Sequence, residues 1–175
     1  MPLTGKNVLI PVADGYHELE MHYPYYRLIE AGAQVFVAGP DGGDFVGKYG
    51  YKLRDVSMLE GLDPATFHGV IIPGGHAPDR LRMDEDVLEF VRTIARGDRL
   101  VAAICHGGWV LADADVVRGR RVTSYPAIRK DLERAGAKWV DEPVVVDRKL
   151  VTSRVPDDLP YFMKAIIPIL QSLPD

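Results

Sequence analysis

Short apolar runs alternate with amphipathic stretches along the chain, and this alternation is what most constrains how its 175 residues can fold. Runs rich in β-branched residues predict buried strands at residues 7–12, 34–39, 69–75 and 99–104. Apolar positions at helical spacing predict helices at residues 17–31 and 84–96. Because parallel strands need crossover connections, we predict an α/β fold, a three-layer sandwich with a mostly parallel central sheet and helices on both faces.

The C-terminal third continues this alternation. It predicts a short strand at 121–125, a helix at 127–136, a hairpin at 142–153 and a final helix at 156–173. Asp84 and Gly97 are typical of a helix start and a helix stop. No linker or repeat interrupts the pattern, so we expect one domain, 1–175. In such sheets, functional residues lie beyond the carboxyl ends of the strands.

Charge and cysteine usage exclude several classes of protein. The net charge of −4 argues against a general nucleic-acid binder, and we interpret the short basic run 118–121 as a solvated turn. A single cysteine forms no internal disulfide. The sequence contains neither a cysteine cluster for zinc nor the G-x-G-x-x-G fingerprint of dinucleotide binding, so we expect no cofactor and no metal. No apolar run reaches the ~18 residues of a membrane span. We expect a cytoplasmic protein without a membrane or nucleic-acid partner.

The stretch "AICHGGW" holds that cysteine, Cys105, at the predicted end of a buried strand. The glycines Gly107 and Gly108 follow, so the pattern is that of a strand–turn–helix nucleophile elbow. We expect Cys105 to have a strained backbone and a thiolate that is stabilised by the start of the next helix. The alternative is a small buried hydrophobe without chemistry.

A second candidate is "IIPGGHAPDR", which follows another buried strand. Its glycines Gly74 and Gly75 end that strand at the same rim of the sheet. We predict that the N–H groups of Gly75 and His106 form an oxyanion hole, with Gly107 letting the backbone approach a ligand. The alternative is a plain tight turn.

A third candidate is "ADGYHELE", at the end of the first strand. The spacing of Glu18 and His22 would suit two metal ligands, but no third ligand is indicated, so we expect exposed helix residues. We interpret Glu20 and Glu30 as solvated positions too.

Together these segments resemble the ThiJ/PfpI family of the class I glutamine-amidotransferase-like superfamily, and most of all its PfpI intracellular-protease-like subgroup. The resemblance also rests on "GKYGY", "TSYPAIRKDLERAGAKWVDEPVVVD" and "TSRVPDDLP". It implies a flavodoxin-like sandwich, a homodimer or a hexamer, Cys105 as the nucleophile and His106 as its partner. An acidic residue from a neighbouring subunit completes the family triad, and that position falls on Asp79. Asp79 alternatively caps a short helix.

Two residues depart from the family pattern. His17 stands where the family usually has a glutamate that hydrogen-bonds the cysteine, and Gly108 replaces a common proline. Since Glu18 would point about 100° away on a helix, we expect His17 to face Cys105, either protonated or as a base.

The resemblance predicts a cysteine-dependent hydrolase or lyase. Its substrates would be small carbonyl compounds or their adducts, as for a glyoxalase or deglycase, or peptides, as for an intracellular peptidase. The alternative is a stress-response redox sensor or holdase chaperone with an oxidisable cysteine. We expect Tyr23 and Tyr26 in the core or a subunit interface, and Trp109 in the core or lining the pocket.

Overall fold

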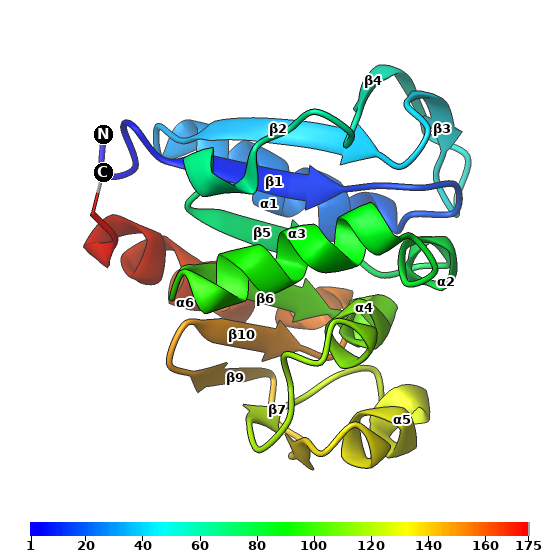
Figure 1. Ribbon diagram of the computed structural model, residues 1–175, viewed down its shortest axis with the longest axis vertical. Helices are drawn as coiled ribbons and strands as arrows, with labels where there is room; N and C mark the ends of the chain where they lie inside the picture. The colour runs from blue at the N-terminus through cyan, green and yellow to red at the C-terminus, as the bar shows by residue number, and fades with distance from the viewer. Residues whose placement is uncertain (175) are drawn as a thin grey trace.

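A computed structural model describes residues 1–174 and shows one twisted eight-stranded sheet between two layers of helices (Figure 1). The strand order is β3-β4-β2-β1-β5-β6-β10-β9. The strands are β1 (Asn7–Pro11), β2 (Gln34–Gly39), β3 (Gly43–Val46), β4 (Lys52–Met58), β5 (Gly69–Ile72), β6 (Leu100–Ile104), β9 (Val144–Asp147) and β10 (Leu150–Ser153). A separate two-stranded ladder joins β7 (Arg121–Val122) to β8 (Lys138–Trp139).

The helices cover both faces of the sheet, which confirms the predicted three-layer α/β architecture. In Figure 1, α3 and α4 lie in front of the sheet, while α1 and α6 lie behind it. The helices are α1 (Glu18–Glu30), α2 (Ala77–Leu81), α3 (Glu85–Arg96), α4 (Gly108–Asp113), α5 (Arg129–Arg134) and α6 (Leu159–Ser172). Short 3-10 turns stand at Pro64–Thr66, Cys105–Gly107, Pro126–Ile128 and Pro156–Asp158.

The central pairings are parallel, as the alternation of strands and helices predicted. β1 pairs in parallel with β2 and β5, and β6 with β5 and β10. The predicted C-terminal hairpin is present as the antiparallel pair β9–β10. The antiparallel pair β3–β4 was not predicted, because its strands are short, polar and largely exposed. Every residue of β5 and β6 is buried, so the core is centred on these two strands.

Helix α1 turns a different face to the core from the predicted one. Leu19, Tyr26 and Ile29 are exposed, and the buried residues of this helix are Glu20, Met21, Pro24 and Leu28. Glu20 therefore lies on the buried face of the helix, since it precedes the buried residues Pro24 and Leu28 by four and eight positions.

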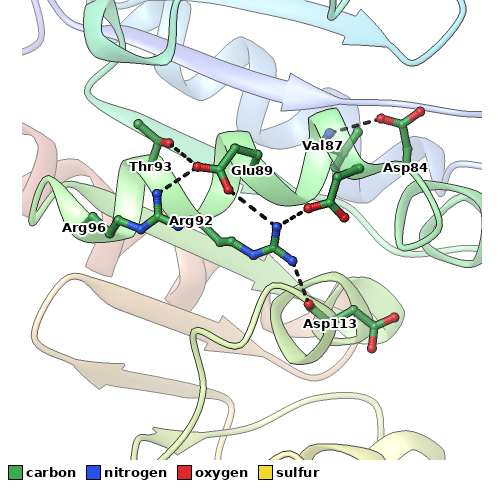
Figure 2. A network of polar contacts seen from close by, with 8 residues as sticks. Asp84, Val87, Glu89, Arg92, Thr93, Arg96 and Asp113 are labelled. Atoms are coloured by element: carbon green, nitrogen blue, oxygen red, sulfur yellow. Dashed lines mark hydrogen bonds and ion pairs between the residues drawn. The ribbon is translucent and has the colours of Figure 1, made fainter.

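A polar network fastens α3 to the end of α4 (Figure 2). The side chain of Asp84 accepts a hydrogen bond from the backbone N–H of Val87, which confirms the predicted helix cap. Arg92 pairs with Glu85 and Glu89 and donates to the carbonyl of Asp113, the last residue of α4. Exposed ion pairs of this kind contribute roughly 0–1 kcal/mol each, so the contact serves mainly to position α4.

Within residues 1–174, no helix is both long enough and apolar enough to cross a membrane.

Candidate active site around Cys105

Cys105 lies in the tight turn between β6 and α4. Its φ of +60° is in the left-handed region, and only 8% of the residue is exposed. A non-glycine residue in that region is strained, as predicted for a nucleophile elbow. The turn is held closed on one side by the backbone N–H of Tyr125, which donates to the Cys105 carbonyl at 3.2 Å. At Gly107, a Cβ would lie only 2.6 Å from the carbonyl oxygen of Ile72, so the turn also needs a glycine two residues later.

Two backbone N–H groups point at the sulfur, those of His106 and Gly75. Gly75 has a φ of +81°, and a Cβ there would lie 2.3 Å from the carbonyl oxygen of Gly15. The glycine pair after β5 is therefore more than a tight turn, because it places a donor beside the thiol. That the N–H groups of Gly75 and His106 form an oxyanion hole stays a prediction.

Glu20 is the carboxyl group of the site. It is fully buried, and its Oε2 accepts a hydrogen bond from the Gly74 N–H at 2.7 Å. The carboxyl group lies beside the Cys105 thiol and interacts with it. Oε1 has no hydrogen-bond partner among residues 1–174. The expectation that Glu20 is solvated was wrong, because α1 begins at Glu18 and turns position 20 inward over the end of β6.

Glu20 and Cys105 affect each other's protonation. Burial raises the pKa of Glu20 to about 7, against the opposing effect of the Gly74 N–H. Burial, followed by the charge of Glu20, raises the pKa of the Cys105 thiol, although the N–H groups of His106 and Gly75 act in the other direction. The predicted stabilisation by the helix start is therefore present but outweighed. The pair titrates as one unit: it loses its first proton near pH 7 and holds a single proton above that pH.

His17 occupies a different place from the one we expected. It precedes α1 with an extended backbone, and its ring lies edge-on to Tyr49, with 5.4 Å between the ring centroids. Within the described chain, no hydrogen bond or ring contact joins His17 to Cys105; Glu20 holds that position. Nδ1 of His17 is buried without a partner in residues 1–174, and burial, then Lys48, lowers the pKa of the ring.

His106 is the histidine beside the thiol. Its Nδ1 lies 3.4 Å from the Cys105 sulfur. The ring stacks on Tyr125, with centroids 4.8 Å apart, and meets the edge of Trp109 at 5.2 Å. Burial, followed by the charge of Lys48, lowers the pKa of His106 below its usual 6.5. The ring is therefore neutral at pH 7 and able to accept a proton.

Asp79 is exposed in the short helix α2, which His76 precedes as the capping position. Within one chain, over the residues described, no hydrogen bond joins Asp79 to His106. Its action on a neighbouring subunit stays a prediction, as does self-association itself.

A loop after β3 completes the surroundings of the site. Oε1 of Glu18 accepts hydrogen bonds from the N–H groups of Tyr49, at 2.8 Å, and Tyr51, at 3.2 Å. The N–H of Lys48 donates to the Tyr16 carbonyl at 2.9 Å. No pattern in the sequence indicates that Lys48 approaches the site, because this approach depends on the unpredicted β3–β4 pair. No group of three or more His, Cys, Asp or Glu side chains suited to a metal occurs in residues 1–174.

A strained cysteine at the carboxyl end of a parallel strand, with a buried carboxyl group beside it, defines an α/β protein with the strand–turn–helix geometry of a nucleophile elbow. The chain belongs to the DJ-1/PfpI family, whose sequence profile matches residues 6–168. A protein of Pyrococcus abyssi named as a deglycase is 43% identical over 164 residues, which are 94% of this chain and 99% of that protein. YraA of Bacillus subtilis, named as a candidate cysteine protease, is 37% identical over 168 residues, covering 95% of this chain and 99% of that one.

Solved structures show the same fold. A two-domain protein of Anabaena variabilis, with a DJ-1/ThiJ/PfpI-like and a ferritin-like domain, superposes with a TM-score of 0.92 at 37% identity. The match covers 97% of this chain and 50% of that one. DJ-1beta of Drosophila melanogaster superposes with a TM-score of 0.89 at 29% identity, covering 97% of this chain and 92% of that one.

Proposed function

We propose that this protein is a cysteine-dependent enzyme that acts on small carbonyl compounds or their adducts, as a glyoxalase or deglycase does. The observation that carries the proposal is the strained Cys105 with the buried carboxyl group of Glu20 beside its thiol. Such a pair can attack a carbonyl and protonate the resulting oxygen without taking a proton from solvent. The name deglycase, carried by relatives such as that of Pyrococcus abyssi, agrees with this chemistry.

The first step is nucleophilic addition to the carbonyl group. With the proton on Glu20, the thiolate of Cys105 adds to the carbonyl carbon, and a sulfur–carbon bond forms. The π electrons move to the oxygen, which takes the proton from Glu20, so a neutral hemithioacetal results. The N–H groups of Gly75 and His106, which favour the thiolate of Cys105, would stabilise the negative charge on the oxygen as it develops.

The second step needs a base. With an α-oxoaldehyde such as methylglyoxal, a base removes the proton from the carbon that carries the sulfur, and the neighbouring carbonyl oxygen takes up a proton to give an enediol. The base returns its proton to the neighbouring carbon, and the hydroxyl group on the sulfur-bearing carbon loses its proton as the thioester carbonyl forms, so the number of protons is unchanged. His106 is neutral and lies beside the sulfur, so it suits this role. The product is a thioester of lactate, which water hydrolyses to free the thiol. The overall reaction adds water to methylglyoxal and needs no external oxidant.

Turnover measurements test the proposal. We expect the wild-type protein to convert methylglyoxal to lactate and the Cys105→Ser variant to be inactive, with Glu30→Gln as a control on the exposed end of α1. A fluorogenic peptide in parallel assays tests the protease function that the name of YraA suggests. An inactive wild-type protein, or a Cys105→Ser variant as active as the wild type, would contradict the proposal.

A further inference from the structure

The loop that carries Lys48 is firmly attached to the start of α1. Its N–H groups at positions 49 and 51 donate to Glu18 in α1, and that of Lys48 donates to Tyr16, two residues before the helix. In addition, the Gly47 N–H donates to the Tyr51 carbonyl at 2.8 Å. The backbone at Lys48 is therefore fixed with respect to the site, although the side chain is exposed.

The Lys48 ammonium has no anionic partner in the described part of the chain, residues 1–174. No carboxylate oxygen of residues 1–174 lies within 4.0 Å of it, and its contact is with the ring of Tyr49, 5.3 Å from Nζ to the centroid. An exposed cation–π contact of this kind is weak, about 0.5–1 kcal/mol, so it leaves the charge available. Oε1 of Glu18 accepts from two backbone N–H groups of the same loop, and its Oε2 is buried without a partner among residues 1–174.

The charge of Lys48 acts on the site from one side. The Tyr49 ring, over which Lys48 lies, contacts His17, and the N–H of His17 donates to the Gly74 carbonyl. Tyr16, which accepts the Lys48 N–H, is bridged to Gly75 beside the thiol. The charge of Lys48 also affects the protonation of Glu20 and His106, which flank the sulfur, and of His17. A lysine that influences all three lies within electrostatic range of any molecule bound above the thiol.

We propose that Lys48 determines specificity by holding an anionic group of the substrate, so that the site prefers carbonyl compounds that carry a carboxylate or phosphate. This inference rests on the proposed function, because it names the substrate class of the same site. The two histidines near Lys48 are neutral at pH 7, so the lysine is the fixed positive charge there. The anion would face Lys48 while the carbonyl carbon lies over Cys105.

Alkylation of Cys105 tests this without requiring turnover. Iodoacetate and iodoacetamide transfer nearly identical groups: the thiolate displaces iodide and a sulfur–carbon bond forms, but iodoacetate alone is negatively charged. Because both reagents consume the same thiolate, the ratio of their rates is independent of the thiolate fraction. We expect Lys48→Met to lower the iodoacetate-to-iodoacetamide rate ratio about five- to tenfold, and Lys48→Arg to retain most of the wild-type ratio. The matched control is Lys52→Met, on the exposed strand β4, which should leave the ratio unchanged.

Aldehyde protection gives an independent reading. Glyoxylate and glyoxal both block the thiol reversibly as hemithioacetals, and only glyoxylate carries a carboxylate. We expect Lys48→Met to weaken protection by glyoxylate about five- to tenfold more than protection by glyoxal. An alkylation ratio in Lys48→Met within about twofold of the wild-type value, or an equal fall in Lys52→Met, overturns the inference.

The two proposals can fail separately. If no carbonyl compound is turned over but the alkylation ratio falls in Lys48→Met, the proposed function fails and the anion site stands. If methylglyoxal is turned over while the ratio is unchanged, the function stands and the assignment of Lys48 is wrong.

Discussion

The shared proton between Glu20 and Cys105 predicts an unusual pH dependence of thiol reactivity. The first proton leaves the pair near pH 7, the value to which burial raises the pKa of Glu20. Above this pH the remaining proton lies either on Glu20, which leaves Cys105 as a thiolate, or on Cys105, which leaves Glu20 as a carboxylate. The ratio of these two forms does not change with pH. Alkylation consumes only thiolate, so its rate should rise about tenfold per pH unit below neutrality and then level off.

Glu20→Gln removes the acid but keeps the shape of the side chain, and its amide oxygen can still accept from the Gly74 N–H. A carboxylate at about 4 Å, with an effective dielectric constant near 20, disfavours the thiolate by about 4 kcal/mol, or about three pKa units. In the Glu20→Gln variant, the repulsion between carboxylate and thiolate is absent, and the glutamine side chain has no proton to exchange with the thiol. We expect the step near pH 7 to disappear, so that the rate rises continuously and exceeds the wild-type rate about tenfold at pH 8.

The assay is the second-order rate of iodoacetamide labelling between about pH 5 and 10, followed by mass spectrometry of the Cys105 peptide. Glu30→Gln, on the exposed end of the same helix, should keep the wild-type profile. His106 does not account for the step, because its pKa is lowered below 6.5. A Glu20→Gln profile that keeps a step near pH 7 would refute the shared proton.

Three further predictions concern stability, measured as the free energy of unfolding in denaturant. The raised pKa of Glu20 means that the folded state binds more protons than the unfolded state between about pH 4.5 and 7, so the free energy of unfolding falls as the pH rises across this range. Glu20→Gln should therefore be about as stable as the wild type at pH 4 and about 3 kcal/mol more stable at pH 8. Equal pH slopes in the two proteins would contradict this. Gly75→Ala places a Cβ 2.3 Å from the Gly15 carbonyl oxygen and should cost about 3 kcal/mol or more, whereas a loss below about 1 kcal/mol would show that the turn adapts. Asp84→Ala removes the cap of α3 and should cost about 1 kcal/mol, with no change in Cys105 labelling.

The sequence predicts most of the sheet because its central strands are continuous apolar runs. The elbow at Cys105 was predictable as well, since a cysteine between such a run and two glycines has few other structural explanations. Glu20 was missed because the helix was assigned its inner face from apolar residues alone, and the tyrosines and leucine of α1 suggested another stripe. The signal was nevertheless present: positions 20, 24 and 28 recur at helical spacing, and the first of them carries a carboxylate.

Lys48 illustrates a different limit. The loop at 47–51 is polar and rich in glycine, and its local sequence fits any surface turn. Its position depends on hydrogen bonds to Glu18 and Tyr16, some thirty residues away, and on a strand pair with little apolar periodicity. Pairings of this range are not encoded in a local pattern, so only the structure reveals them.

His17 connects these observations, because it contacts Tyr49 and lies within the influence of Lys48. A neutral imidazole at this position leaves the ammonium unpaired, whereas a carboxylate there would attract it and compete with an anionic ligand. We therefore expect His17→Glu to lower the iodoacetate-to-iodoacetamide ratio at Cys105 about as much as Lys48→Met, roughly five- to tenfold. The step near pH 7 should persist, because Glu20 is unchanged. His17→Gln, which adds no charge, is the matched control and should keep the wild-type ratio. An unchanged ratio in His17→Glu would mean that position 17 does not govern the charge of Lys48, and that the histidine there affects packing against Tyr49 alone.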